Sequence, residues 1–544
     1  MWAKTPFKTT YLACALIFQD VSASAIPIVD LGYVRYRGNL TFPDSVAYLG
    51  IPYAEPPVGD GRFRAPAPLN ISRVRSEAGG QVVNLTSYPD FCIQGTTGSG
   101  DAGGAGSEDC LKIDVYAPLG AGKNDNLPVL VYIHGGGYTY GNPANWPFNH
   151  WIHQSQPVVV VSVRYRLDSF GFLATPEFSD SRNGDFNVGF RDQIQALKWV
   201  KAHISSFGGD PNKVTINGES AGGSSVELHL VAHEKETLFA RAIAQSVYRT
   251  PLPTPEEQKP LFDVYTEAAG CPSGSAKDQL ACLRKASVSA LARAQDKVTS
   301  FAPATTYNAF HPVLDGQLLT DYPTRSIVRG EFRQVPLMVG ATSDEVLTDT
   351  TVLGAALQAM FPAVTNTTVA RFEAVYPVTA YANESDRNRV ALGESQLICA
   401  RSIMGNAWRK SNPTFTYRYN QANPTGSDLV HVGHAAENWM MFLGTNTGFN
   451  GSTTFSPMTP TETAFAEELI AYWLSFVRSG NPNTFKLDRS PEWRAFTSGD
   501  KARIVLQQGP NKTTTESGSF LEVEDGGQTK RCAFVASVVG EEQN

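Results

Sequence analysis

A serine flanked by glycines, in the segment TINGESAGG, has the setting of a nucleophile. Ser220 lies in the pattern Gly218-x-Ser220-x-Gly222, directly after a β-branched run that favours a strand. At a sharp turn from strand to helix only small neighbours let the chains approach, and the serine oxygen then projects above the sheet. The pattern alone is a weak signal, so the residues that would activate the hydroxyl decide its meaning.

A serine hydroxyl needs a base to remove its proton and an acid to orient that base. At an elbow of this kind the acid and then a histidine are expected downstream. His434, in VGHAAENW, follows a predicted strand, with His431 as its neighbour and His311 also downstream. Glu345 follows a buried strand at its carboxyl end, where sites of open sheets lie, and Asp344 stands beside it. Spacing alone leaves both choices open.

Three glycines in YIHGGGYTYG could hold an oxyanion. Gly135, Gly136 and Gly137 follow a predicted strand, and amides without side chains can point into a cavity. With the amide of Ala221 they could donate to a developing negative charge, and one such donor lowers a barrier by roughly 3–4 kcal/mol. A phosphate-binding loop is the alternative, but no Lys-Ser/Thr pair follows the glycines.

The elements that must position these residues alternate between strand and helix. Apolar residues at helical spacing predict a helix over 188–204, and residues 251–310 and 348–412 are mainly helical. The predicted strands cover 127–133, 157–163, 213–217, 335–340 and 414–420. Continuously apolar strands indicate a parallel sheet covered on both faces. The sequence therefore predicts one α/β domain over residues 26–544, with no dividing linker.

The N-terminus has the features of a secretory signal peptide over residues 1–25. Lys4 and Lys8 precede a short apolar stretch, and Ala23-Ser24-Ala25 forms a small-residue cleavage site. No later run reaches membrane-spanning length. The 544 residues carry a net charge of −7 without a basic block, which argues against a nucleic-acid partner. We therefore expect a secreted, soluble protein.

The cysteines and sequons fit an exported chain. Once Cys14 leaves with the signal peptide, six cysteines remain, and an even number suggests three disulfides. Short loops suggest the pairs Cys92–Cys110 and Cys271–Cys282, which leaves Cys399–Cys532. No histidine cluster lies near them at metal-ligand spacing, so we expect no metal and no cofactor. The candidate glycosylation sites are Asn39, Asn70, Asn84, Asn366, Asn383, Asn450 and Asn511.

Several long motifs together resemble one family. HGGGY, SEDCL, FNVGFRDQ, FGGDPNKVTINGESAGG and VGHAAE are similar to segments of the type-B carboxylesterase/lipase family, which includes the cholinesterases, and the resemblance runs from about Ile28 to the C-terminus. It implies an α/β-hydrolase fold and a Ser-Glu-His triad. The residues that match are Ser220, Glu345 and His434 for the triad, and Gly136, Gly137 and Ala221 for the oxyanion hole. The resemblance also supports the three disulfide pairs.

Other matching residues have supporting roles in the family. Arg62 with Glu108 and Arg166 with Asp192 resemble its buried ion pairs. Ser246, in AQSV, resembles a serine that often supports the triad acid. The ion pairs are not counted as site residues, and for Ser246 a buried hydroxyl with a purely structural role is an equal alternative.

Departures from the family narrow the expected substrate. Between Ile93 and Asp109 the loop has no aromatic residue, whereas cholinesterases carry there a tryptophan that stacks on the choline cation. The same loop is the lid of family lipases, but here Ile93 is its only large apolar residue. The sequence therefore predicts a secreted serine carboxylesterase acting on small dissolved esters. A triacylglycerol lipase or an esterase of a secondary-metabolite pathway are the alternatives, and a non-catalytic adhesion relative is disfavoured because the triad is retained. The oligomeric state is not predicted.

Overall fold

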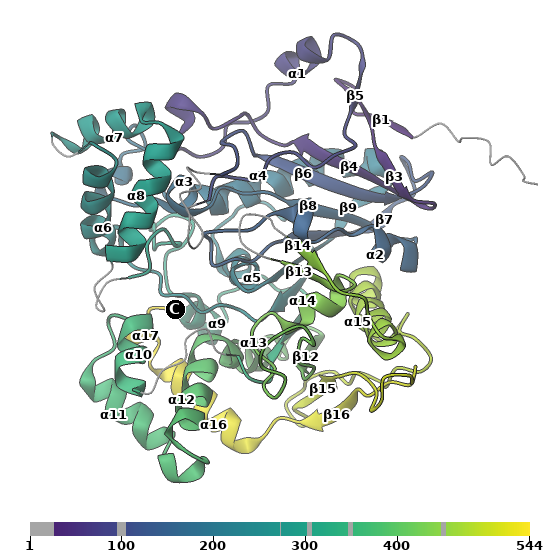
Figure 1. Cartoon of the computed structure of the whole chain (residues 1–544), viewed down its shortest axis with the longest axis vertical. Helices are drawn as coiled ribbons and strands as arrows, with labels where there is room; N and C mark the ends of the chain where they lie inside the picture. The colour runs from purple at the N-terminus through teal and green to yellow at the C-terminus, as the bar shows by residue number, and fades with distance from the viewer. Residues whose placement is uncertain (1–26, 95–104, 272–273, 302–306, 346–351, 448–452) are drawn as a thin grey trace, which may run out of the picture.

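The computed structural model describes residues 27–94, 105–271, 274–301, 307–345, 352–447 and 453–544. Its centre is an 11-stranded sheet with the strand order β16-β15-β12-β11-β10-β9-β7-β8-β6-β4-β3 (Figure 1). The strands of this sheet are β3 (Asn39–Phe42), β4 (Ser45–Pro52), β6 (Lys112–Pro118), β7 (Leu127–Ile133), β8 (Val159–Val163), β9 (Gly209–Glu219), β10 (Arg241–Gln245), β11 (Leu337–Thr342), β12 (Thr414–Tyr419), β15 (Ala502–Leu506) and β16 (Phe520–Val523).

The middle of the sheet is parallel, from β8 across β7, β9, β10, β11 and β12 to β15. Antiparallel strands extend both edges: β6, β4 and β3 on one side and β16 on the other. Two small sheets lie outside it, one of β1 (Ile28–Asp30), β2 (Arg35–Arg37) and β5 (Val82–Asn84), the other a hairpin of β13 (Thr445–Thr447) and β14 (Thr453–Phe455). The five predicted strands are confirmed as β7, β8, β9, β11 and β12 of the parallel core, which also contains β10 and β15.

Helices cover both faces of the sheet, because side chains alternate along each strand. Val129, Val131 and Ile133 of β7 belong to the core cluster that includes residues of α4, α5, α9 and α13. Leu130 and Tyr132 point the other way and pack with α2, α14 and α15. The helices are α1 (Ile71–Ala78), α2 (Asn149–Gln154), α3 (Asp168–Phe172), α4 (Val188–His203), α5 (Ala221–Val231), α6 (Pro255–Ala268), α7 (Ala276–Lys285), α8 (Val288–Phe301), α9 (Pro323–Arg329), α10 (Leu353–Met360), α11 (Asn366–Val375), α12 (Glu384–Gly393), α13 (Cys399–Trp408), α14 (Ala436–Met441), α15 (Pro460–Ser479), α16 (Gly526–Ser537) and α17 (Val539–Glu542).

Of the predicted helical regions, α13 packs on one face of the sheet, and the other helices lie beside it. In Figure 1, α6, α7 and α8 gather at the upper left and α10, α11 and α12 at the lower left.

Local sequence signals set the two ends of the longest helix, α15. The side chain of Thr459 accepts a hydrogen bond from the amide of Glu462, Pro460 occupies the first turn, and Gly480 ends the helix at φ +77°.

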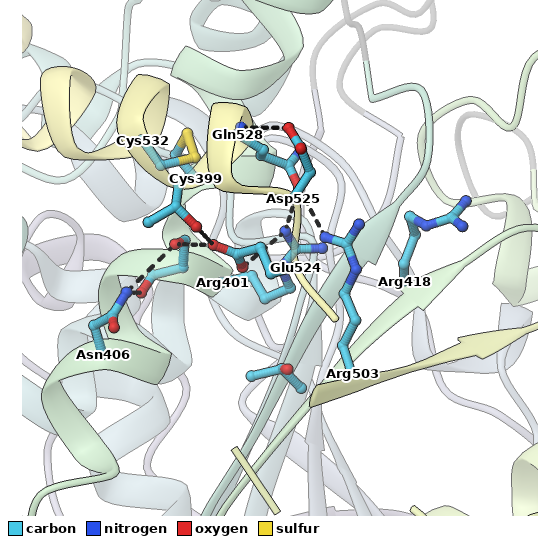
Figure 2. Close-up of polar contacts among 12 residues, drawn as sticks. Cys399, Arg401, Asn406, Arg418, Arg503, Glu524, Asp525, Gln528 and Cys532 are labelled. Carbon is cyan, nitrogen blue, oxygen red and sulfur yellow. Dashed lines mark hydrogen bonds and ion pairs between the residues drawn. A yellow bond between two sulfur atoms is a disulfide. The ribbon is translucent and has the colours of Figure 1, made fainter. Parts of the chain in front are cut away.

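All three predicted disulfides are present: Cys92–Cys110, Cys271–Cys282 and Cys399–Cys532. The third closes a loop of 133 residues and links α13 to α16 (Figure 2). Beside it, Glu524 accepts hydrogen bonds from Ser402 at 2.8 Å and from Arg401 at 3.3 Å. The end of the chain is therefore fastened to the body by both a covalent bond and a buried ion pair.

The two ion pairs expected from the resemblance are also formed. Arg62 contacts Glu108 at 2.7 Å. Arg166 donates to both carboxylate oxygens of Asp192 at 2.7 and 2.8 Å, and both side chains are buried. Arg166 stands in the segment between β8 and α3, and Asp192 lies on α4, so this pair joins a loop near the site to a helix behind the sheet.

The predicted signal peptide and the sequon at Asn450 lie outside the described residues. Of the remaining sequons, Asn39 is half-buried and donates to the carbonyl of Thr86 at 2.9 Å. The others are exposed: Asn70, Asn84, Asn366, Asn383 and Asn511. No helix in the described part of the chain is both long and apolar enough to cross a membrane.

Candidate active site

Ser220 occupies a strained turn between β9 and α5. Its backbone has φ +60° and ψ −124°, a region that residues with a side chain rarely adopt. A Cβ on Gly218 would lie 2.4 Å from the backbone of Gly222, and a Cβ on Gly222 would lie 2.1 Å from the carbonyl oxygen of Ile133. The glycines of the motif are therefore required by close backbone approach, and the surrounding packing holds the serine in its turn.

The three predicted triad residues come together at this turn. His434 Nε2 lies 2.8 Å from the Oγ atom of Ser220, and His434 Nδ1 lies 2.7 Å from Oε2 of Glu345. The other oxygen of Glu345 accepts a hydrogen bond from the amide of Thr342 at 2.9 Å. Glu345 follows β11 and His434 stands between β12 and α14, so neighbouring strands deliver both residues to the carboxyl edge of the sheet.

The alternatives left open by spacing lie elsewhere. His431 is 38% exposed and its Nδ1 contacts Asp428 at 2.7 Å. Asp344 accepts a hydrogen bond from the amide of Val432 at 3.0 Å, so it holds the loop that carries the histidine. His311 is buried, and its Nδ1 contacts a backbone carbonyl. In the structure the contact with Ser220 belongs to His434, and the contact with that histidine belongs to Glu345.

The glycine loop lies against the serine turn. A Cβ on Gly135 would meet the carbonyl of Glu219 at 2.6 Å and the side chain of Ser220 at 3.0 Å. Gly136 and Gly137 have φ values of +103° and +61°, and no hydrogen bond from their amides to another described residue is found. Ala221 is the first residue of α5, where helix amides are free and the dipole favours negative charge. The glycine loop therefore reaches Ser220 through Gly135, and Ala221 directly follows the serine.

Two further buried carboxyl groups surround His434. Glu219 Oε1 lies 3.4 Å from His434 Nε2, and its other oxygen accepts a hydrogen bond from Asn438 at 3.2 Å. Glu437 lies on α14, and one of its oxygens is 3.5 Å from the side-chain amide of Gln245. Sequence reasoning assigned neither glutamate a role, although both stand inside motifs already singled out, next to Ser220 and three residues after His434.

These carboxyl groups set the charge of the site. Burial alone would lower the pKa of His434, but the charges of Glu345 and Glu219 raise it to about 9. Burial raises the pKa of Glu219, and burial with the charges of Glu219 and Glu345 raises that of Glu437 to about 8. Burial also raises the pKa of Glu345, but the charge and hydrogen bond of His434 outweigh it, so this pKa lies below its ordinary value.

The serine expected to support the triad acid is close to it. Ser246 is buried and its hydroxyl contributes to the low pKa of Glu345. Its Oγ atom makes no hydrogen bond of standard distance and angle with a described group, so the interaction of Ser246 with Glu345 is weak. The amide of Ser246 donates to the carbonyl of Gly340 on β11, which fixes the residue beside the acid.

One group in the described residues brings potential metal ligands together: Glu394, Cys399 and Cys532. The two sulfurs form the third disulfide, and Glu394 accepts two hydrogen bonds from Arg531, at 2.7 Å each. This group is therefore part of the C-terminal attachment. The chemistry at Ser220 is of another kind, since a hydroxyl, a base and free amides suit attack on a carbonyl carbon.

Comparison with known proteins agrees with this geometry. Residues 27–535 match the model of the carboxylesterase family. Secreted lipase 4 of Gibberella zeae is 32% identical over 86% of this chain and 85% of its own length. Acetylcholinesterase of Danio rerio is 30% identical over 95% of this chain and 89% of its own length.

A solved structure shows the same fold. The crystal structure of Aspergillus niger EstA superposes with a TM-score of 0.81 at 30% identity and covers 96% of this chain and 99% of that one. The mostly parallel sheet with helices on both faces is that of an α/β-hydrolase. The chain therefore belongs to the carboxylesterase family and is a carboxylic ester hydrolase.

Proposed function

We propose that the protein is a secreted serine carboxylesterase that works through an acyl-enzyme. The observation that carries this proposal is the continuous contact from the hydroxyl of Ser220 through the imidazole of His434 to the carboxylate of Glu345. Ser220 is the nucleophile, His434 the general base and then the general acid, and Glu345 the group that orients the imidazole. The amides of Gly136, Gly137 and Ala221 form the oxyanion hole.

In the acylation half, neutral His434 accepts the hydroxyl proton at Nε2 while Ser220 Oγ attacks the ester carbonyl carbon. Glu345 stabilises the imidazolium that forms, and its contact at Nδ1 keeps Nε2 facing the serine. Negative charge develops on the carbonyl oxygen beside the free amides. His434 then returns the proton to the leaving alkoxide, the bond to the alcohol breaks, and the acyl group remains on Ser220.

Deacylation repeats these steps with water. His434 takes a proton from water, the hydroxide attacks the acyl carbon, and the proton passes to Ser220 Oγ as the acid leaves. No group beyond these residues is needed for either half.

Secretion is supported by the N-terminal signal pattern, the three disulfides and the similarity to a secreted lipase. We propose that glycans are attached at the exposed sequons. Asn39 is a less accessible acceptor, because its side chain is half-buried and donates a hydrogen bond to the carbonyl of Thr86.

The test is hydrolysis of p-nitrophenyl acetate by the wild-type protein and by S220A. We expect a burst of p-nitrophenol from the wild type and a loss of kcat of about 10⁶-fold in S220A, with an unchanged circular dichroism spectrum. An organophosphate should add one adduct, located by mass spectrometry on the peptide that contains Ser220. Full activity in S220A would falsify the assignment.

A triacylglycerol lipase is the second candidate, because two relatives that are named lipases share 32% and 35% identity with this chain. The match at 35% identity covers 61% of this chain. Rates on a panel of p-nitrophenyl esters graded by acyl length, together with an emulsion of a long-chain triglyceride, separate the two. A carboxylesterase prefers the short dissolved esters, and a lipase prefers the emulsion.

A further inference from the structure

A fully buried ion pair joins Arg249 to Glu542. The guanidinium Nη2 lies 2.9 Å from Oε2 of the glutamate, and both side chains are 0% exposed. The next two residues, Gln543 and Asn544, are polar and buried as well. Burying such groups costs free energy, and an ion pair often contributes no more stability there than apolar side chains of the same size would. The contacts of the two residues show what the pair holds in place.

Arg249 belongs to a segment, residues 246–250, that supports the turn of the nucleophile. The segment directly follows β10. The carbonyl of Gln245 accepts a hydrogen bond from the amide of Ser220 at 3.1 Å, and the amide of Tyr248 donates to the carbonyl of Ser220 at 3.4 Å. The strained backbone of the serine is therefore bonded at both ends to residues within four positions of Arg249.

Arg249 also holds a π-helical turn, Glu394–Ile398, which lies between α12 and α13. The amide of Arg249 donates to the carbonyl of Gln396 at 2.9 Å, and its Nη1 donates to the carbonyl of Ser395. Turns of this type are rare and are frequently found at functional sites. One arginine thus links the segment after β10 to a distorted turn in the helical layer.

This turn and this segment both lie against the triad acid. A Cβ on Gly393, the residue before the turn, would lie 1.9 Å from the carbonyl oxygen of Glu345, so the two backbones are in direct contact. Ser246, the first residue of the segment, has its hydroxyl close enough to help keep the pKa of Glu345 low. Arg249 therefore connects the supports of two members of the triad, Ser220 and Glu345.

Glu542 fixes the guanidinium in this position. While Oε2 pairs with Arg249, Oε1 accepts a hydrogen bond from the hydroxyl of Ser395 at 2.5 Å. The charge of Arg249 also lowers the pKa of Glu227 on α5, although burial raises that pKa to about 7 overall. Glu542 is thus bonded both to the arginine and to the turn that the arginine holds.

The two residues after Glu542 extend this attachment. The carbonyl of Gln543 accepts a hydrogen bond from the amide of Leu252 at 2.8 Å, and the side chain of Asn544 donates to the carbonyl of Thr250 at 3.1 Å. In Figure 1 this part of the chain passes from α17 to a position beside α9. Three consecutive residues therefore hold the chain that follows β10.

We propose that Glu542 is a positioning residue for ester hydrolysis, and that it acts through Arg249 on Ser220 and Glu345. The inference rests on the proposed function, since it concerns the same triad. Without the ion pair, the segment and the π-helical turn can shift relative to each other. The hydroxyl, imidazole and carboxylate then lose part of their alignment, so the expected loss is in kcat.

The experiment compares E542Q with the matched control E524Q. Glu524 is also buried and pairs with Arg401 at 3.3 Å in the C-terminal attachment (Figure 2). Both variants leave a buried arginine without its full partner, so both should lower the urea concentration at the unfolding midpoint. Only E542Q should lower kcat on p-nitrophenyl acetate, by about 10- to 100-fold per folded molecule, with folding measured by circular dichroism.

The pH dependence of kcat/KM separates positioning from charge. The charge of Glu345 raises the pKa of His434, so a looser contact between them moves the midpoint of the pH–rate profile to lower pH. R249M removes a positive charge, which by charge alone would move the midpoint to higher pH. We expect E542Q and R249M both to move it to lower pH, and E524Q to leave it in place. R249M/E542Q should lose no more kcat than R249M, because the two residues act along one route.

S395A provides a milder test in case E542Q folds poorly, because it removes only the hydroxyl that donates to Glu542 and should lower kcat by about three- to tenfold. Wild-type kcat in both E542Q and S395A would overturn the proposal, as would equal losses in E542Q and E524Q or a midpoint that rises in R249M. Those results would leave the triad assignment intact. Inactivity of the wild type, or full activity of S220A, would instead reject the proposed function and this inference with it.

Discussion

Glu219 Oε1 lies 3.4 Å from His434 Nε2, the same ring nitrogen that contacts the hydroxyl of Ser220 at 2.8 Å. The imidazole therefore has two neighbours that compete for one nitrogen. The charge of Glu219 stabilises the protonated imidazole, whereas only the neutral imidazole can take the proton of Ser220. This relationship makes the pH dependence of the enzyme a test of the site.

We predict that kcat/KM rises with pH through the pKa of His434, about 9, because only the neutral imidazole acts as a base. Glu219 raises this pKa, so E219Q should move the midpoint of the rise to lower pH. The plateau rate should fall, by about tenfold, because the same carboxylate stabilises the imidazolium formed during attack. The measurement is a pH–rate profile on p-nitrophenyl acetate. E236Q removes an exposed carboxylate and should leave the midpoint in place, and a midpoint that E219Q does not move would contradict the assignment.

The choice between Glu345 and Asp344 can be made by removing each charge in turn. E345Q keeps the shape of the side chain but removes the charge at His434 Nδ1, and kcat should fall by about 10⁴-fold. D344N weakens the hydrogen bond to Val432 and should cost only about tenfold. Steady-state kinetics of both variants check this prediction. A larger loss of kcat in D344N than in E345Q would show that Asp344, and not Glu345, is the triad acid.

Two neighbouring glycines provide a matched test of the oxyanion loop. In G136A the new Cβ would lie 2.1 Å from the carbonyl oxygen of Tyr140, so the loop must move and kcat should fall by about 10²–10³-fold. In G137A the nearest atom is 3.8 Å away, and the loss should stay within about tenfold despite the positive φ. Both are measured by kcat with folding monitored by circular dichroism. Equal activity of the two variants would argue against the close approach of Gly136 and Tyr140.

The buried ion pair of Arg166 and Asp192 should matter for stability. D192N leaves the guanidinium of Arg166 buried without its full partner, which costs about 3–5 kcal/mol, and should lower the urea concentration at the unfolding midpoint. The control D180N breaks an exposed pair with Arg182 and should leave the midpoint unchanged. Coincident urea unfolding curves for D192N and D180N would show that burial of the Arg166–Asp192 pair does not affect the free energy of unfolding.

Much of the parallel core was predictable because its strands are continuously apolar. β7 coincides with the prediction, and α4 ends one residue earlier than predicted. β9 begins at Gly209, four residues before the predicted start at Lys213, because Gly209 pairs with Leu127 of β7. Such a pairing joins residues far apart in sequence and leaves no local signal. The antiparallel edge strands β3, β4, β6 and β16 and the parallel strands β10 and β15 were not predicted, although β3 and β4 are close in sequence and pair across a short turn.

The site was predictable where a motif isolates one residue, and less so where two candidates are adjacent. Ser220 stands alone among small residues, whereas Asp344 and Glu345 follow the same strand. The turn that brings Glu345 Oε1 back to the amide of Thr342 depends on tertiary packing and chooses between them. Glu219 and Glu437 were unassigned because burial, which raises their pKa values, cannot be read from a sequence.

The Cys399–Cys532 disulfide closes a ring that contains residues 424–430 and His434 but neither Ser220 nor Glu345. A protease that cut the chain within the exposed residues 424–430 would leave two fragments joined through that bond. The nicked enzyme would migrate as an intact band on a gel run without reductant, although its histidine would no longer be joined through the chain to β12. Electrophoresis with and without reductant therefore distinguishes an inactive preparation that has been clipped from one that has misfolded.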